Sequence, residues 1–401
     1  MPSSSTSTPA PPVSGKALLF IFVVVFLDLL GAGILLPIIP YYVRPFRSDA
    51  LTVSLLYLSF SAAQFVASPI LGVLSDRYGR RPVLLLSILG SAAGYFLFGI
   101  AGSLFLMFFA RILDGFTGGN ISTAQAYIAD VSRPEDRGKN FGLIGAAFGL
   151  GFIIGPALGG LLSTISIQAP PYAAGVLSLL TATFGYFVLP ESLPPAHRRV
   201  HAIELADLNP IRPIFQALSR QSLRLMLLSI FLLNFSFGGL QANFALFTLV
   251  RFEFTPQQNA WIFTFIGLCA AITQGLIVRR LSPILGERRL SLIGLAILTA
   301  GFVLISVSYA KWMLYLAVVL VSGVGLASPS QIALLSHRVS SREQGWLLGT
   351  TQSLVSLTRV LGPIWAGWTF DVLGTGSPYS TGALLLLGAL GLNWMATKME
   401  K

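Results

Sequence analysis

The chain has 401 residues, of which 54% are hydrophobic and only 10% are charged, and its mean hydropathy is +0.77. Soluble domains carry about 25% charged residues, so this composition excludes a water-soluble globule, a separate soluble enzyme domain and a disordered chain. The net charge of +11 is typical of the cytoplasmic loops of a membrane protein, and in so apolar a chain it does not indicate nucleic-acid binding.

Twelve hydrophobic runs separated by short polar segments predict twelve membrane-spanning helices, because one crossing needs about 20 apolar residues. Residues 1–16 precede them, are rich in Ser, Thr and Pro, and lack the basic start and cleavage site of a secretory signal, so we expect a disordered cytoplasmic tail. The predicted helices lie near residues 17–41, 51–74, 82–101, 104–131, 139–164, 171–190, 222–250, 257–281, 289–309, 312–337, 344–371 and 379–397.

A polar linker at 191–221 divides the predicted helices into bundles covering 17–190 and 222–397, and residues 398–401 are expected to form a second short tail. With the N-terminus inside, Lys and Arg divide twenty to four between the inner and the outer segments. Cytoplasmic loops collect basic residues, so this split predicts that both termini are cytoplasmic and that the number of crossings is even.

The two predicted bundles resemble each other. Asp136 precedes Pro156 in the first bundle as Glu343 precedes Pro363 in the second, at an offset of 207 residues. Two parallel six-helix repeats with a substrate site at their interface are a recurring plan of membrane transporters. The sequence therefore predicts an all-α membrane protein of two pseudo-symmetric six-helix bundles.

The segment GVLSDRYGRR joins the second and third predicted helices. Its Gly72 allows close helix contact, and Gly79 allows the left-handed turn that a very short loop demands. Asp76 can cap a helix start and pair with an arginine. The basic residues of this loop are Arg77, Arg80 and Arg81. A plain positive-inside loop explains the arginines but not the ordered Gly and Asp spacing, so we expect a latch on the cytoplasmic side.

Three charged residues lie at spanning depth in the first bundle. Asp28 is roughly 17 Å into the first predicted helix, and Arg111 and Asp114 are about 10 and 15 Å from the outer end of the fourth. Charges are costly in lipid, so they should face a cavity or each other. We expect Asp28 first, and Asp114 second, to carry a proton while Arg111 holds the coupling network. The alternatives are a structural ion pair of Arg111 with either carboxylate, and a neutral Asp28 that stabilises a bend.

The fifth predicted helix carries the pattern Gly151-x-x-x-Gly155-Pro156. Glycines four residues apart lie on one face and let a neighbouring backbone approach closely, and Pro156 favours a kink. By itself this pattern indicates a packing face with a conformational role.

Scarce polar residues at spanning depth, together with some aromatic ones, are expected to line a central cavity. Each of them could equally hold neighbouring helices together. The candidates are Gln64, Gln125, Tyr127, Asn234, Phe237, Gln241, Asn243, Trp261 and Gln331.

These motifs resemble those of a known family. Residues 72–81 resemble the signature loop of the major facilitator superfamily, and Arg111, four residues before Gly115, is similar to its fourth-helix motif. The segment Gly151–Pro156 is similar to the helix-five motif associated with proton-coupled exporters. Together they resemble the tetracycline–proton antiporter branch, which implies proton-coupled drug export by alternating access, a bacterial-type inner or plasma membrane, and a monomer.

The sequence departs from that branch at three positions. Where that branch has acidic residues in helices three and nine, this sequence has Gly94 and about Leu298. Where the branch has a histidine in helix eight, the matching position here lies near Ala270. These groups are linked to tetracycline transport, so the resemblance does not extend to tetracycline as the substrate.

The sequence lacks the common motifs of nucleotide binding and of hydrolytic catalysis. The sequence contains no P-loop, no nucleophile elbow and no zinc-protease helix, and a lone Cys269 excludes a disulfide framework. We therefore expect no enzyme and no cofactor or metal. The expected partners are a small amphipathic substrate, protons and the lipid bilayer. The alternatives are a proton symporter or uniporter for a metabolite such as a sugar, and a non-transporting membrane receptor.

Overall fold

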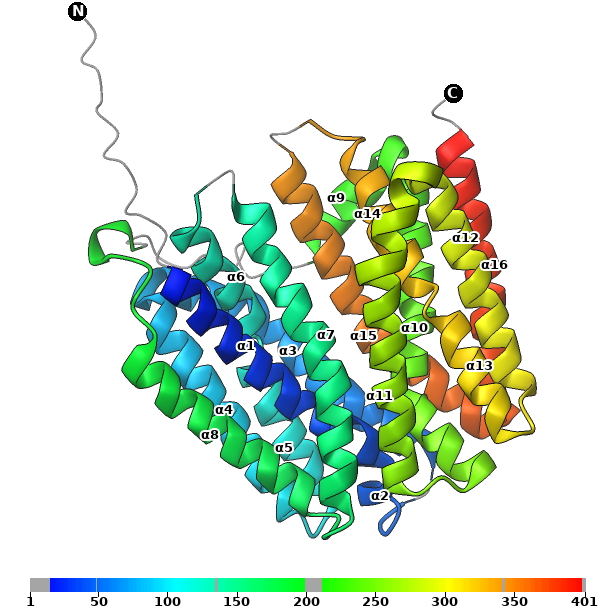
Figure 1. Ribbon diagram of the computed structural model, residues 1–401, viewed down its shortest axis with the longest axis horizontal. Coiled ribbons are helices and arrows are strands. Elements are labelled where there is room, and N and C mark those ends of the chain that lie inside the picture. The colour runs from blue at the N-terminus through cyan, green and yellow to red at the C-terminus, as the bar shows by residue number, and fades with distance from the viewer. Residues whose placement is uncertain (1–14, 48, 134–135, 199–210, 341–342, 399–401) are drawn as a thin grey trace, which may run out of the picture.

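The computed structural model describes residues 15–47, 49–133, 136–198, 211–340 and 343–398. The regular secondary structure of these residues consists of helices, without strands. The predicted N-terminal tail before residue 15, the middle of the predicted linker and the last three residues lie outside the described residues. The chain begins its first helix and ends its last helix at the same end of the molecule, which we call the termini end (Figure 1). The opposite end is called the far end.

The first bundle contains two interrupted helices. The first helix breaks at Pro37, and the fourth breaks at the pair Gly118-Gly119. Its elements are α1 (Gly15–Leu35), η1 (Leu36–Ile38), α2 (Ile39–Val43), α3 (Ala50–Tyr78), α4 (Arg80–Gly99), α5 (Leu104–Thr117), α6 (Asn120–Val131), α7 (Arg137–Ser163) and α8 (Ala169–Val188), followed by the short turn η3 (Pro195–His197).

The second bundle repeats this plan. Its elements are α9 (Arg212–Ser219), α10 (Gln221–Phe252), α11 (Pro256–Ile272), the π-helix η5 (Thr273–Val278), α12 (Arg279–Val307), α13 (Lys311–Val321), α14 (Val324–Ser336), α15 (Gln344–Leu373) and α16 (Ser377–Lys398). Gly286 interrupts α12 with a non-helical backbone at φ 71°, so α12 holds the division that the sequence places between residues 281 and 289.

The two bundles are related by the repeat that the sequence predicts. Gly79, with φ 106°, and Gly286, with φ 71°, are 207 residues apart and both end a helix at the termini end. Only glycine adopts such angles at low cost. At Gly79 a side chain would also collide with the Glu191 carboxylate, which explains why the short loop needs glycine there.

Ten helical segments of the described chain are long and apolar enough to cross a membrane. One of them, Pro256–Val307, spans 52 residues and contains the break at Gly286. This finding confirms an all-helical membrane protein. Twelve crossings stay a prediction from the sequence.

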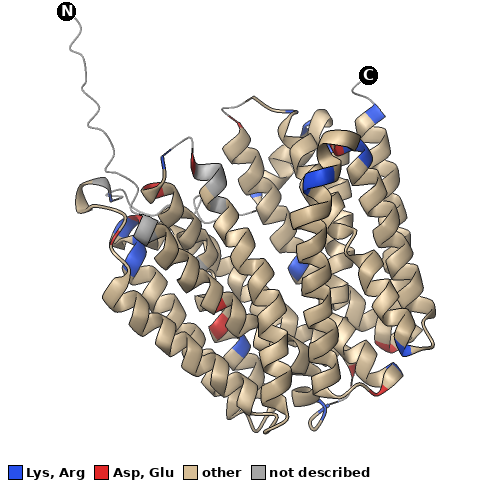
Figure 2. Ribbon diagram, viewed as in Figure 1, with Lys and Arg blue, Asp and Glu red and all other residues tan. Residues whose placement is uncertain are grey.

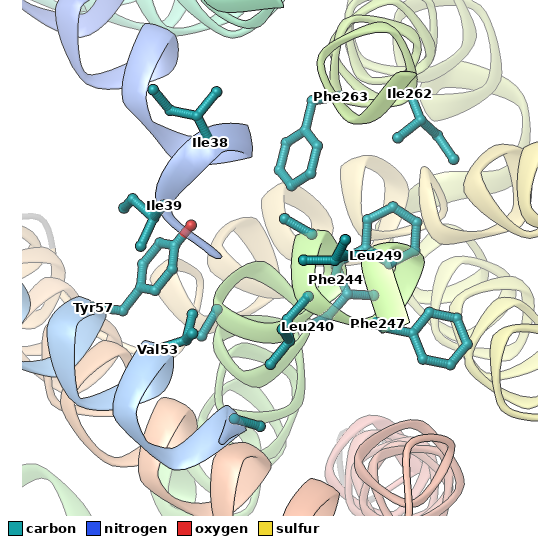
Figure 3. Packing of buried hydrophobic residues seen from close by; sticks show 14 of the residues in the cluster. Ile38, Ile39, Val53, Tyr57, Leu240, Phe244, Phe247, Leu249, Ile262 and Phe263 are labelled. Atoms are coloured by element: carbon teal, nitrogen blue, oxygen red, sulfur yellow. The ribbon is translucent and has the colours of Figure 1, made fainter. Parts of the chain in front are cut away.

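The bundles meet at the far end. The Asp371 carboxylate at the end of α15 accepts hydrogen bonds from the backbone N–H groups of Ala50 and Leu51, both at 2.8 Å. The Ser54 hydroxyl donates to the Asn243 side-chain oxygen at 2.8 Å. Figure 3 shows apolar residues of η1, α2 and α3 facing those of α10 and α11 in one buried cluster. Apolar packing and hydrogen bonds thus close this end.

The termini end is open between the bundles. On α7, Gly145 and Gly149 have no atom within 4 Å of where a Cβ would lie, and the same holds for Gly345 and Gly349 on α15. The molecule is therefore closed at the far end and open at the termini end.

Close packing of α1 on α7 depends on glycine. A Cβ at Gly33 would lie 2.8 Å from the Gly151 carbonyl oxygen, and a Cβ at Gly155 would lie 2.8 Å from the Gly33 Cα. The pattern in the fifth predicted helix is therefore a contact within the first bundle.

We expect Gly155→Leu to lower the melting temperature in detergent, because the added side chain has no space against α1 and overpacking costs about 1–3 kcal/mol. Gly145→Leu, on the open face of the same helix, is the matched control and should melt like the wild type. Equal melting temperatures for both variants would contradict the close contact.

Candidate functional site

A buried ion pair lies within the first bundle. Arg111 Nη1 and Asp114 Oδ2 are 2.6 Å apart on α5, and the two residues are 7% and 3% exposed. The guanidinium carbon of Arg111 lies 4.2 Å from the centre of the Phe60 ring. Few charged residues lie at mid-height, and most Lys and Arg gather near the helix ends (Figure 2). Of the two carboxylates that the sequence offers to Arg111, Asp114 forms an ion pair with it.

Gly94 on α4 makes room for this pair. A Cβ at Gly94 would lie 2.8 Å from the Cβ of Asp114, and the hydroxyl of Ser91, one turn earlier, is hydrogen-bonded to the Asp114 carboxylate. Gly94 is the position on which the acidic residue of the resembling branch falls. The carboxylate of this chain therefore reaches the same space from α5 rather than from α4.

Tyr95 on α4 reaches α1 one turn after Asp28. Its ring packs against Gly31, one turn after Asp28 on α1, at 3.4 Å from where a Gly31 Cβ would lie. The hydroxyl lies within electrostatic range of Asp28, Asp114 and Arg111. We call Asp28, Tyr95, Arg111 and Asp114 the carboxylate cluster. Sequence reasoning missed Tyr95, because an aromatic residue in an apolar helix carries no distinguishing signal. Two carboxylates and one guanidinium can together bind and release protons.

The loop after α3 forms a network of charges at the termini end. Arg80 Nη1 lies 2.5 Å from Asp76 Oδ1, and Arg80 Nε lies 3.1 Å from Asp130 Oδ2 at the end of α6. The backbone N–H of Arg80 donates to Glu191 at 2.9 Å. The network joins α3, α4 and α6 to the segment after α8, and Glu191 is a member that sequence reasoning missed.

The other predicted loop residues lie outside this network. Arg81 donates a hydrogen bond to the Tyr186 carbonyl and lies over its ring, at 5.4 Å from the ring centre. Arg77 lies 5.7 Å from the centre of the Tyr78 ring, and nothing lies within 4 Å of where a Gly72 Cβ would be. Arg81 thus joins the start of α4 to the end of α8, and the space beside Gly72 is open.

The second bundle has a counterpart of the Arg80–Asp130 pair. Glu287 and His337 stand 207 residues after Arg80 and Asp130, and their side chains are 3.5 Å apart. The basic and acidic partners have exchanged places, and the pair carries opposite charges only when His337 is protonated. The loop network of the second bundle is therefore weaker than that of the first.

We expect Asp76→Asn to slow turnover several-fold with little change in substrate affinity, because it weakens the contact with Arg80 at a loop that moves in the conformational step. Asp130 still holds Arg80, so the loop should stay folded. Export rates measured over a range of substrate concentrations separate the two parameters. A loss of affinity at constant turnover would contradict this role.

Five of the predicted cavity residues form hydrogen bonds inside a bundle or between bundles. Gln64 donates to the Gly118 carbonyl, Tyr127 to the Pro190 carbonyl, Asn234 to the Ile230 carbonyl and Gln331 to the Ser229 hydroxyl, while Asn243 accepts from Ser54. The contacts of Gln64, Asn243 and Gln331 join different helices and match the alternative that polar residues hold helices together, whereas the Asn234 bond stays within α10.

The remaining four predicted cavity residues differ in exposure. Gln125 is exposed, and Phe237 and Gln241 are half-buried. Trp261 is also exposed, in line with Leu268 and Ile272 on one stripe of α11, which is the arrangement of a lipid-facing surface. Among the described residues no group of three or more His, Cys, Asp or Glu side chains could hold a metal ion.

Comparisons with known proteins agree with this architecture. The family model of the Major Facilitator Superfamily matches residues 21–363 and 251–399. The chain is 33% identical over 355 residues to the class C tetracycline resistance protein of Escherichia coli, covering 88% of this chain and 89% of that protein. It is 29% identical over 383 residues to multidrug resistance protein 2 of Bacillus subtilis (strain 168), covering 94% of each.

A solved structure has the same fold. The human organic anion transporter MFSD10 (TETRAN) is 28% identical and superposes with a TM-score of 0.73, covering 94% of this chain and 99% of that one. A bacterial homologue of the human lysosomal transporter Spinster, in an inward-facing and unoccupied conformation, superposes with a TM-score of 0.77 at 15% identity and shares the fold. The chain therefore belongs to the Major Facilitator Superfamily, and it is a multi-pass membrane transporter rather than an enzyme.

Proposed function

We propose that this protein exports a small amphipathic compound in exchange for protons. Similarity to tetracycline and multidrug resistance proteins supports export. In this proposal the protein is a monomer in a cell membrane with both termini cytoplasmic, so the open termini end faces the cytoplasm and receives the compound there. Closure of that end and opening of the far end would release the compound outside.

The carboxylate cluster is the observation that carries the proposal. A buried ion pair of Arg111 and Asp114 is electrically neutral, and Asp28 adds a carboxyl that is half-buried. Protonation of one carboxyl changes the net charge of the cluster by one unit in a medium where charge is costly. Since α4 packs against α5 and its Tyr95 reaches α1, this change can bias the conformational step and couple it to the proton gradient.

Transport by the purified protein in liposomes tests the proposal. A panel of anionic, neutral and cationic amphipathic compounds is loaded, and flux is followed with and without an imposed pH gradient. We expect uphill export that depends on the gradient and stops when a protonophore collapses it. Flux that ignores the pH gradient would indicate a uniporter, and co-movement of protons with the substrate would indicate a symporter. Either result overturns the proposal.

A further inference from the structure

Arg359 lies at the middle of α15 and faces the interior of the molecule. It is about 15 residues, or roughly 22 Å, from the first residue of that helix. The lipid-facing stripe of α15 is marked by exposed apolar side chains at Leu361, Ile364 and Trp368. At about 100° per residue, Arg359 lies nearly opposite this stripe. Its side chain therefore points toward the axis between the bundles.

Open space reaches Arg359 from the termini end. The side chain is exposed although it lies at the middle of α15 and many protein atoms lie around it, as expected for a side chain in an interior opening. On the same helix face, Gly345 and Gly349 have empty space above them and Gln352 is exposed. Beyond Arg359 the face is buried from Pro363 onward. Arg359 thus lies at the inner limit of the opening.

The guanidinium of Arg359 has no partner among the described residues. It makes no hydrogen bond, ion pair or ring contact with any of them, and no charged group lies near it. The acidic residues of the second bundle stand at helix ends. Glu343 directly precedes α15. Its carboxylate accepts a hydrogen bond from Arg220, which lowers the pKa of that carboxyl. Asp371 is bonded to the start of α3.

A cation at this depth of a membrane protein is rare, and such a residue either pairs with a carboxylate or faces a water-filled opening on a substrate path. The first bundle shows the ordinary solution, since Asp114 neutralises Arg111 at 2.6 Å. No side chain does this for Arg359. A counter-ion that arrives with the transported compound would supply the missing charge, and a planar guanidinium binds a carboxylate or sulfonate through two parallel hydrogen bonds.

We propose that Arg359 binds the anionic group of the transported compound, so that the substrates are amphipathic organic anions such as aromatic carboxylates. This inference rests on the proposed function, because it takes the opening between the bundles as the substrate path. The anionic group meets Arg359 at the inner limit of the opening, and the apolar part lies in the space toward the termini end.

The anion site and the carboxylate cluster lie at a similar depth on opposite sides of α3. Helices α3 and α15 are antiparallel, and Gly367 packs against Ser54, which places Arg359 level with about residue 62 of α3. Phe60, half a turn away, contacts Arg111. The second bundle thus binds the substrate anion, and the first bundle binds the proton.

Equilibrium binding without any pH gradient tests the proposal. The probes are matched sets on naphthalene, biphenyl and decyl scaffolds, each as a carboxylate, a primary amide and an amine, titrated calorimetrically into the full chain in detergent micelles. We expect the carboxylates to bind more tightly than their amides. Arg359→Gln should weaken carboxylate binding about 10- to 100-fold, the range of a charged hydrogen-bonded contact, and leave amide binding unchanged. Arg359→Lys should rescue part of the loss, because it keeps the charge but not the two-pronged geometry.

Arg251→Gln is the matched control. It removes the same charge from an exposed residue at the far end of α10, and carboxylate binding should not change. Arg359→Gln should also melt at or above the wild-type temperature, since it removes an unpaired cation. The proposal is wrong if no carboxylate is preferred by the wild type, if the preference survives Arg359→Gln, if amide binding falls equally, or if this variant melts well below the wild type.

The two proposals can fail separately. Carboxylate binding at Arg359 combined with flux that ignores the pH gradient would contradict proton coupling alone. Proton-driven export that favours amines over carboxylates would contradict the anion site alone.

Discussion

Asp114→Ala is expected to destabilise the protein by about 3–5 kcal/mol, the largest loss of stability that we predict for one substitution. The change removes the partner of Arg111 and leaves a buried guanidinium without its charge-assisted hydrogen bond. It also leaves a void beside Gly94, where the Asp114 side chain now packs. Unfolding in detergent micelles, by heat or by denaturant, measures the effect.

A double variant separates stability from function. Arg111→Met combined with Asp114→Leu removes both charges and fills the space, so most of the stability should return, because apolar replacement of a buried pair is often neutral. Proton-driven export should stay absent in that variant. Restored stability together with restored export would reduce the pair to a structural element, and a double variant as unstable as Asp114→Ala would contradict the electrostatic explanation.

Asp28→Asn is expected to abolish proton-driven export while insertion, folding and equilibrium substrate binding stay intact. Asparagine keeps the size and most of the hydrogen bonding of the aspartate but cannot titrate between pH 5 and 8. Asp28 is half-buried, and an amide of the same size should fit there without a steric change. Export from proteoliposomes under an imposed pH gradient measures the effect.

Asp49→Asn is the matched control for Asp28→Asn. This substitution also replaces a carboxylate with an amide, but at the N-cap of α3 at the far end, where the Asp49 side chain accepts a hydrogen bond from Thr52. This variant should retain gradient-driven export. Uphill export by Asp28→Asn itself would exclude Asp28 as the proton carrier and leave Asp114 as the remaining carboxyl of the cluster.

The sequence by itself determined the helices, the two bundles and the local charge contacts. Apolar runs long enough to cross a bilayer identify the helices, and the repeat of 207 residues identifies the bundles, because both depend only on composition and spacing. The Asp76–Arg80 contact and the Arg111–Asp114 pair are separated by four and three residues. Helix geometry brings Arg111 and Asp114 to one face of α5. Asp76 and Arg80 lie on either side of the break at Gly79, where the very short loop keeps them close.

Only the tertiary structure decided which faces meet. Tyr95 packs against Gly31 of α1, Gly94 makes room for a carboxylate from another helix, and Arg359 faces the opening between the bundles. None of these placements follows from spacing, because each depends on how a helix is rotated about its axis. In a soluble helix the apolar stripe reveals that rotation. In a membrane the lipid-facing side and the packed side are both apolar, so the pattern of hydrophobic residues does not distinguish them, and packing between helices decides.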